Sequence, residues 1–332
     1  MSEEVKKFKI TIDGQTAEVL PGTSILDAAR QIGGKSVPPA MCYYSKLEAS
    51  GGRCRTCLVE VSKGSEADPR PMPKLVASCR TNVMDGMEVK NLSSDKAQEG
   101  RKAVTEFLLV NHPLDCPVCD QAGECHLQDL GYEHGNLETR TEFKRNTYDA
   151  DDLGPNIKLN MNRCILCARC VLAANQLTGE REHGILFRGD HAEISTYLNK
   201  ALDNDFIGNV IDVCPVGALT DRTARFASRV WFTKPMNASC KCDKCSGKAT
   251  VYMKGDEIVR VTARKDQWGE VEEFICDTCR FERKSLSDWN IEGPRNIDRH
   301  SVISLNHYEK PKDELRVLDN PMAKEISEKD EK

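Results

Sequence analysis

The sequence predicts an α+β protein built from several small domains that metal centres hold together. Three observations lead to this prediction: 16 cysteines among 332 residues, their grouping into four clusters along the chain, and a modest 39% of hydrophobic residues. This cysteine content is too high for apolar packing alone and too low for a miniprotein stapled by disulfides. The 6% aromatic content favours several small hydrophobic cores over one large core.

The charge balance excludes several classes of protein. Forty-seven basic and 52 acidic residues give a net charge of −5, and no basic run suggests a nucleic-acid binder. No stretch approaches the roughly 18 apolar residues of a membrane span. The start, MSEEVKKFK, lacks the apolar core of a signal peptide, so we expect a reducing cytosol. Clustered cysteines are metal ligands there rather than disulfides.

The first cysteine group follows the element order of a β-grasp ferredoxin. Residues 8–20 predict a hairpin that turns at Asp13-Gly14, and Thr23 or Ser24 can cap the helix that follows. Close cysteines followed by one remote cysteine are typical of a plant-type [2Fe–2S] site, although the first gap between cysteines is longer here than in that type. A zinc site or buried thiols are the alternatives. The four residues are Cys42, Cys54, Cys57 and Cys79.

The second group combines a histidine with three cysteines. An apolar helical run around 104–108 should deliver the histidine to a helix end. Thiolates favour iron–sulfur clusters or zinc, and imidazole suits both, so the spacing alone leaves zinc and a [4Fe–4S] cluster open. The group is His112-x3-Cys116-x2-Cys119-x5-Cys125.

The third group is the triplet of a bacterial-type [4Fe–4S] ferredoxin. Cys164, Cys167 and Cys170 are each separated by two residues, and Cys214 follows at a distance. Ala174 occupies the position where a two-cluster ferredoxin has its next cysteine. We therefore predict one cluster, with Cys214 as the remote fourth ligand.

The fourth group admits more than one metal. Its pattern is Cys242-x2-Cys245-x30-Cys276-x2-Cys279, with a predicted hairpin between Thr250 and Val261. Four such thiolates could form a zinc ribbon or hold an iron–sulfur cluster. Cys240 is either an alternative ligand or spare.

Catalytic motifs are missing from the sequence. Gly33-Gly34-Lys35-Ser36 ends like a P-loop, but Ala29 stands where the first glycine is required. The sequence contains neither the dinucleotide pattern G-x-G-x-x-G nor H-E-x-x-H nor a Ser/His/Asp set. We therefore expect no catalytic residue of its own.

Three long motifs carry a family resemblance. The chain resembles the G subunit of NADH:quinone oxidoreductase, the bacterial counterpart of the 75-kDa subunit of respiratory complex I, over about residues 5–285. It resembles a short form without the family's large molybdopterin-oxidoreductase-like domain. The motifs are His112-Pro-Leu-Asp-Cys-Pro-Val-Cys-Asp-Gln-Ala-Gly-Glu-Cys125, Asn162-Arg-Cys-Ile-Leu-Cys-Ala-Arg-Cys170 and Gly208-Asn-Val-Ile-Asp-Val-Cys-Pro-Val-Gly-Ala-Leu-Thr220.

The resemblance implies three clusters that relay single electrons from a flavin subunit toward quinone. It implies a [2Fe–2S] cluster on the first group, and [4Fe–4S] clusters on the second and third groups, with His112 as a ligand. It also implies partners: the flavin/NADH-binding subunit and the quinone-side iron–sulfur subunits. The chain would be a non-catalytic relay, inactive alone, peripheral on the cytoplasmic side of the inner membrane, and membrane-associated only through its complex.

The fourth group departs from the family pattern C-x2-C-x3-C…C. Cys242 and Cys245 fit, Ala249 stands at the third position, Cys276 fits the fourth, and Cys279 is extra. A cluster there cannot be carried over unchanged, so zinc, a [4Fe–4S] cluster and a metal-free vestige stay open.

These interpretations divide the chain into five parts. They are a β-grasp [2Fe–2S] domain at 1–97, a His-Cys₃ module at 98–137, a [4Fe–4S] ferredoxin-like domain at 138–235, a small cysteine-rich β lobe at 236–292, and a charged, mostly disordered tail at 293–332.

Two other functions compete with the electron relay. An iron–sulfur subunit of the diaphorase module of an NAD-linked hydrogenase or formate dehydrogenase shares the first three groups, but commonly ends near the Cys214 region. A zinc-stapled scaffold without a redox role would be colourless and free of iron.

Overall fold

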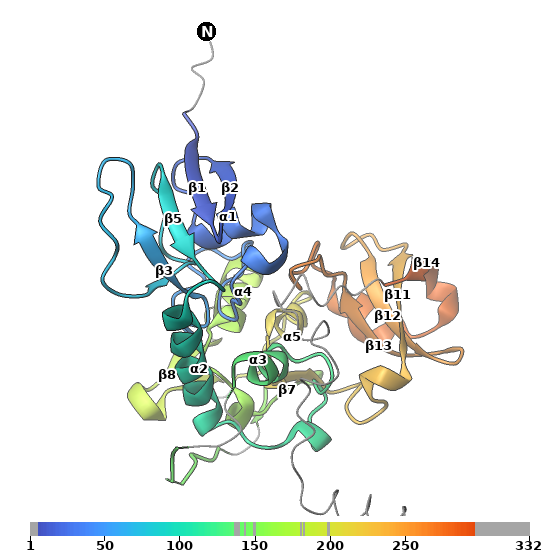
Figure 1. Cartoon of the computed structure of the whole chain (residues 1–332). Helices are drawn as coiled ribbons and strands as arrows, with labels where there is room; N and C mark the ends of the chain where they lie inside the picture. Colours follow the sequence, from blue (N-terminus) through green and yellow to red (C-terminus); the bar gives the residue numbers. More distant parts are fainter. Residues whose placement is uncertain are drawn as a thin grey trace, which may run out of the picture.

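Four small sheets form the framework of the part of the chain that the computed structural model describes, residues 6–135, 140–142, 144–148, 151–179, 181, 183–197 and 200–295. The N-terminal and C-terminal sheets stand apart from each other, with helices α3 and α5 between them (Figure 1). The sequence predicts a charged tail from residue 293. The residues of this tail beyond 295 lie outside the described part of the chain.

The N-terminal sheet has the strand order β2-β1-β5-β3-β4, in which β1 and β5 run parallel and the other pairs antiparallel. Its alternating residues turn one face inward, and Ile10, Val59 and Met87 are fully buried. The predicted hairpin around Asp13-Gly14 is confirmed. The strands are β1 (Phe8–Ile12), β2 (Gln15–Val19), β3 (Leu58–Lys63), β4 (Val76–Ala77) and β5 (Met87–Lys90).

Helix α1 (Ile25–Ile32) covers the inner face of this sheet. The Ser24 hydroxyl oxygen accepts a hydrogen bond from the Asp27 N–H at 3.1 Å, which caps the helix as the sequence predicts. The long loop from α1 to β3 contains three of the first four cysteines. Helix α1 and the sheet together frame this loop.

Helices α2 (Asp95–Val110) and α3 (His126–His134) pack against each other below the sheet (Figure 1). Arg101 of α2 is fully buried, and its Nε and Nη2 donate to the Leu58 carbonyl at 3.0 and 2.8 Å. This contact fixes α2 against β3 just after Cys57. The end of α2 at Val110 confirms that His112 follows a helix.

The middle of the chain forms two small antiparallel sheets around α4 (Arg169–Thr178) and α5 (Asn209–Val213). The first sheet has the order β10-β7-β6 and the second pairs β8 with β9. The strands are β6 (Asp151–Asp152), β7 (Ile157–Leu159), β8 (His183–Leu186), β9 (Glu193–Thr196) and β10 (Leu219–Asp221).

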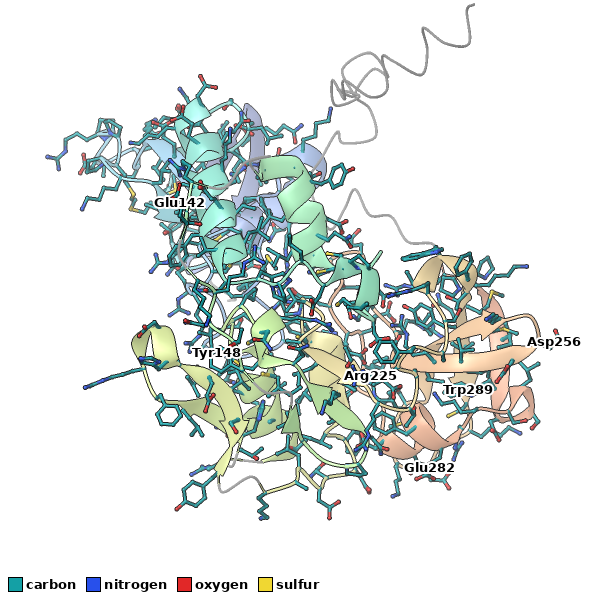
Figure 2. All side chains as sticks on the ribbon, turned by 90° about the horizontal axis from the view of Figure 1, so that it is seen from below. Glu142, Tyr148, Arg225, Asp256, Glu282 and Trp289 are labelled. Atoms are coloured by element: carbon teal, nitrogen blue, oxygen red, sulfur yellow. The ribbon has the colours of Figure 1, made fainter. Side chains whose placement is uncertain are left out.

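The C-terminal lobe is a four-stranded antiparallel sheet with the order β13-β12-β11-β14. The predicted hairpin is confirmed, and Asp256 marks its outer tip (Figure 2). An irregular stretch from 264 to 288, which includes a π-helical turn at Thr278–Glu282, connects β13 to β14. The strands are β11 (Lys234–Cys240), β12 (Lys248–Lys254), β13 (Glu257–Ala263) and β14 (Trp289–Pro294).

Short helical turns complete the described secondary structure: Gly34–Ser36, Cys116–Val118, Met161–Arg163, Gly189–His191, Val230–Phe232 and Leu286–Asp288. Among the described residues, no helix has both the length and the apolar character that crossing a bilayer requires.

Candidate metal centres

The first four cysteines are buried and lie close to one another. All four are less than 10% exposed, and the sulfurs of Cys57 and Cys79 lie 3.3 Å apart. Backbone N–H groups of the loop point at the sulfurs: Gly52 donates to Cys79 at 3.2 Å, and Arg53 donates to Cys42 at 3.3 Å. N–H groups aimed at thiolates stabilise negative charge on sulfur, as an iron–sulfur cluster requires.

Left-handed backbone lets this loop wrap around the sulfurs. Gly51 and Gly52 have φ angles of 92° and 76°, and a Cβ on Gly51 would lie 3.2 Å from the Cys79 sulfur. Four buried thiols, with backbone N–H groups aimed at their sulfurs, therefore fit a [2Fe–2S] cluster.

His112 lies four residues before Cys116 in the chain and has a buried nitrogen that could ligate a metal. Its Nδ1 is buried and has no hydrogen-bond partner among the described residues. Burial, reinforced by the positive charge of Arg163, lowers the pKa of His112 to about 4. A neutral imidazole with an unpartnered buried nitrogen is suited to metal ligation. Cys119 and Cys125 are buried, while Cys116 is exposed at the surface.

Two residues outside the predicted ligands shape this second group. Gly217 leaves room for a ligand, because a Cβ there would lie only 2.2 Å from the Cys119 sulfur. Arg229 donates through Nη1 to the Cys119 carbonyl at 2.7 Å and through Nη2 to the Pro117 carbonyl. Both lie about 100 residues from the group in sequence, so no local spacing reveals them.

The third group surrounds an apolar cavity. All four predicted ligands line it, together with aliphatic side chains such as Leu159, Ile194 and Val216. Burial raises the pKa of the Cys167 thiol to about 11, and it also raises the pKa values of Cys164, Cys170 and Cys214. Ionised thiols in such a cavity need a positively charged partner, so the donor set fits an iron–sulfur cluster.

Strained backbone orients the thiols of the third group. Leu166 and Ala168 have left-handed φ angles of 52° and 60°, which non-glycine residues seldom adopt. In this conformation the Leu166 N–H points at the Cys164 sulfur, 3.3 Å away. The short Cys-x2-Cys-x2-Cys turn thereby faces the cavity.

One hydrophobic cluster links all three groups. It combines aliphatic side chains with Cys42 and Cys54 of the first group, Cys125 of the second, and Cys164, Cys167 and Cys214 of the third. Arg169 fastens the same junction, because its Nη2 donates to the carbonyls of Ala40 and Tyr43 in the loop around Cys42. We call the residues of this hydrophobic cluster the junction core.

Three family models match successive parts of the chain. They are described as a 2Fe-2S iron-sulfur cluster binding domain over residues 5–94, the NADH-ubiquinone oxidoreductase-G iron-sulfur binding region over 101–140, and the ferredoxin-like domain of NADH-quinone oxidoreductase subunit 3 over 154–220. Each matched range contains all four predicted ligands of one of the three groups.

Curated relatives agree with these models. The G subunit of NADH-quinone oxidoreductase from Rickettsia bellii is 38% identical over 90% of this chain and 42% of the relative. The NADH-ubiquinone oxidoreductase 75 kDa subunit of Reclinomonas americana is 40% identical over 86% of this chain and 39% of the relative. Over the matched part, the chain is similar to NADH-quinone oxidoreductase G subunits. It spans about two fifths of the length of these relatives.

A solved structure resembles the fold of this chain. It is described as the crystal structure of an NAD⁺-reducing [NiFe]-hydrogenase in the H₂-reduced state, with a TM-score of 0.57 and 27% identity. The match covers 67% of this chain and 91% of the hydrogenase chain. The chain thus carries a 2Fe–2S domain and 4Fe–4S binding domains in a mixed α/β fold.

The fourth cysteine group lies at one end of the C-terminal lobe. The sulfurs of Cys242, Cys245, Cys276 and Cys279 all lie within 4.8 Å of one another. Cys240 is outside this set, although its sulfur is 3.2 Å from that of Cys279. The structure therefore brings four of the five remaining cysteines into one ligand set.

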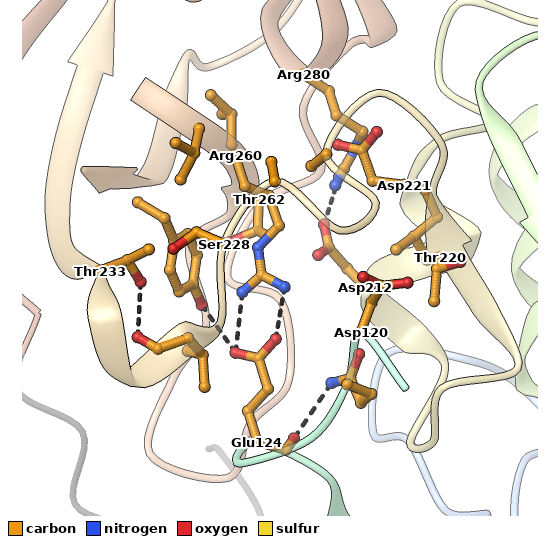
Figure 3. Close-up of a pocket in the computed structure, with 18 of the residues that line it drawn as sticks. Asp120, Glu124, Asp212, Thr220, Asp221, Ser228, Thr233, Arg260, Thr262 and Arg280 are labelled. Carbon is orange, nitrogen blue, oxygen red and sulfur yellow. Dashed lines mark hydrogen bonds and ion pairs between the residues drawn. The ribbon is translucent and has the colours of Figure 1, made fainter. Parts of the chain in front are cut away.

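The lobe also contacts the second group through Glu124, the neighbour of Cys125. Arg260 of β13 donates to the two Glu124 carboxylate oxygens at 2.6 and 3.0 Å, and the Tyr252 hydroxyl lies 3.3 Å from the same carboxylate (Figure 3). Burial opposes ionisation of Glu124, but the charge and hydrogen bonds of Arg260, together with the charges of Lys265 and Arg295, outweigh it and lower the carboxyl pKa. This ion pair locks the lobe against the second centre.

Proposed function

We propose that this chain is an electron-transfer subunit of NADH:quinone oxidoreductase that relays single electrons through one [2Fe–2S] and two [4Fe–4S] clusters. The ligands would be the first three groups, eleven cysteines and His112. One-electron transfer is the chemistry that such clusters supply when bound. The chain would contribute no catalytic residue and would have no activity alone.

The junction core is the observation that carries this proposal. Cysteines of three different groups share one apolar cluster, so clusters bound there would be neighbours rather than isolated centres. A series of adjacent redox centres, kept from water by Met41, Leu127 and Leu130, is what a relay needs.

The proposal extends to partners and location. The subunit would receive electrons from the flavin/NADH-binding subunit and deliver them to quinone-side iron–sulfur subunits. It would sit on the cytoplasmic side of the inner membrane as a peripheral part of the complex. The same proposal divides the chain near residues 97, 137, 235 and 292.

Metal analysis tests the ligand assignment. We expect the anaerobically purified, cluster-loaded full chain to hold about ten irons and to give three distinct paramagnetic signals after dithionite reduction. Cys54→Ser should remove only the [2Fe–2S] signal, and Cys170→Ser only one [4Fe–4S] signal. A zinc-loaded chain without iron would overturn the proposal and favour the scaffold.

A kinetic experiment tests the relay itself. NADH alone should leave the absorbance of the oxidised clusters unchanged, because the sequence holds no flavin or dinucleotide motif. When a purified flavin/NADH-binding subunit is added as well, NADH should reduce the clusters, and that absorbance should decrease after mixing. Failure to bleach with an active flavin subunit would contradict the proposed place in the complex.

The hydrogenase structure supports a second candidate, a diaphorase-module subunit of an NAD-linked hydrogenase. That hydrogenase chain matches over 91% of its length, yet a third of the present chain lies outside the match. The match of the curated G-type relatives to 86–90% of this chain favours NADH:quinone oxidoreductase. Recovery of a nickel-containing partner from native cells would favour the hydrogenase instead.

A further inference from the structure

The fourth cysteine group has the dimensions of a single-ion site. The Cys276 sulfur lies 3.6 Å from that of Cys242 and 3.7 Å from that of Cys245, and the Cys245 and Cys279 sulfurs are 3.8 Å apart. In a Zn²⁺ site with Zn–S bonds of about 2.3 Å, the sulfurs of a regular tetrahedron are about 3.8 Å apart. The observed edges match this value.

An iron–sulfur cube does not fit the same four sulfurs. A [4Fe–4S] cluster inserts four irons and four sulfides between its ligands, so its ligand sulfurs must stand much farther apart. The third cysteine position of the family pattern also offers no ligand. Ala249 occupies it and is fully buried in β12 between Ala238 and Ala263. Cys279 supplies the fourth thiolate instead.

Both pairs of cysteines form turns whose N–H groups face sulfur. The Lys244 and Cys245 N–H groups point at the Cys242 sulfur, and the Cys279 N–H points at the Cys276 sulfur. Gly247, with φ at 68°, closes the first turn, and its N–H lies 3.4 Å from the Cys245 sulfur. A Cβ on Gly247 would lie 2.3 Å from the Cys240 carbonyl oxygen.

We propose that Cys242, Cys245, Cys276 and Cys279 bind one structural Zn²⁺ ion as a tetrathiolate. Among the first-row metals that such a site can take, zinc binds more tightly than ferrous iron and carries no redox activity. The ion staples the loop at 241–247 to the turn at 276–282, and so fastens the end of the lobe.

Cys240 stands outside this coordination and provides a matched control. Its sulfur contacts Cys279 and lies 3.6 Å from Nη1 of Arg283. We therefore expect Cys240→Ser to keep the ion, whereas Cys245→Ser should lose it.

Elemental analysis and zinc-edge X-ray absorption of the cluster-loaded full chain test the proposal. We expect one zinc per chain beside about ten irons, with four sulfurs at about 2.3 Å from zinc. Cys245→Ser should bind less than a tenth of that zinc and keep the three paramagnetic signals, which report that the rest of the chain is folded.

Several results would overturn the zinc site. These are a wild-type chain without zinc, about four additional irons, a single mononuclear iron, or nitrogen and oxygen neighbours around zinc. Loss of zinc from Cys240→Ser would refute the ligand set. The wild-type measurements decide the question even when Cys245→Ser does not fold, and they are independent of whether the chain relays electrons.

Discussion

His112 is the one uncharged ligand in the proposed relay, and its setting suits that role. The imidazole is held neutral by burial, follows the end of α2 directly, and keeps Nδ1 unpartnered among the described residues. A neutral ligand in place of a thiolate reduces the negative charge of a cluster. Less negative charge favours the reduced form.

We predict that His112→Cys lowers the midpoint potential of the first [4Fe–4S] cluster. A thiolate adds one negative charge to the site, and we expect a shift of at least about 60 mV, a tenfold change for a one-electron couple. Redox titration followed by electron paramagnetic resonance measures it. The other two clusters in the same sample are internal controls, and an unchanged or higher midpoint would refute the prediction.

We predict that Gly217→Ala destroys the first [4Fe–4S] site while sparing the other two. The new methyl group would collide with the Cys119 sulfur, 2.2 Å away, and with Cβ of Gln121 at 3.0 Å. Iron should fall from about ten to about six per chain. Gly184→Ala in β8 is the control, because a Cβ there meets no atom within 4 Å. Full iron content in Gly217→Ala would contradict this packing.

At the scale of elements, α4 joins two of the cysteine groups. Its first residue, Arg169, lies between Cys167 and Cys170, and its guanidinium reaches the loop that contains Cys42. The same guanidinium stacks 5.3 Å from the centre of the Tyr44 ring. The start of α4 is therefore a brace between the third and first groups.

We predict that Arg169→Ala destabilises the chain by about 3 kcal/mol, since each hydrogen bond from a charged group contributes about 1.5–3 kcal/mol. The apparent melting temperature should fall by several degrees, and a chelator should strip the [2Fe–2S] cluster faster. Lys254→Ala, at the exposed end of β12, should change stability by less than about 0.5 kcal/mol. Equal melting temperatures for both variants would refute the role of Arg169 as a brace between the third and first groups.

Elements that depend on neighbouring residues were predictable from the sequence. The hairpin at Asp13-Gly14, the capped α1 and the β12–β13 turn follow from local turn and cap chemistry. The cysteine groups were equally visible, because their ligands recur at short intervals. Gly217 and Arg229 were not, since their importance arises from contacts with Cys119 made across some 100 residues.

At the scale of the whole molecule, the C-terminal lobe is packed into the rest of the chain. Its core includes Tyr44 and Leu47 from the N-terminal loop and Val213 from α5. Glu270 accepts hydrogen bonds from Arg30 at 2.8 Å and from the Ser45 N–H at 2.9 Å. The motifs predict a division into five parts, whereas this shared core is visible only in the tertiary structure.

The ion pair between Asp212 and Arg280 secures the lobe against α5 (Figure 3). Both side chains are at most 2% exposed, and Asp212 also accepts from the Ala263 N–H at 3.0 Å. Burial alone would raise the pKa of Asp212, but the charges of Arg280 and Lys265, together with the hydrogen bonds from Arg280 and Ala263, lower it below its usual value. Its contribution to stability is therefore present above an unfolded pKa of about 3.9 and disappears as the pH falls through the lower folded value.

We predict that Asp212→Asn destabilises the chain by about 3–5 kcal/mol at pH 7, because Arg280 becomes a buried, unpaired charge. Thermal unfolding of the cluster-loaded chain measures the loss. The control is Asp256→Asn at the exposed hairpin tip (Figure 2). Replacing both partners, Asp212→Leu with Arg280→Met, should recover much of the stability. A single variant as stable as wild type would refute the prediction.

Because of the junction core, folding of the chain should depend directly on the supply of iron. The cysteines of this core are part of the hydrophobic interior and are also the proposed cluster ligands. Since the free energy of metal binding is also free energy of folding at such sites, a chain made during iron starvation lacks the contacts that join its domains. Its apolar surfaces then stay accessible to chaperones and proteases, so cellular abundance of the subunit should follow iron availability.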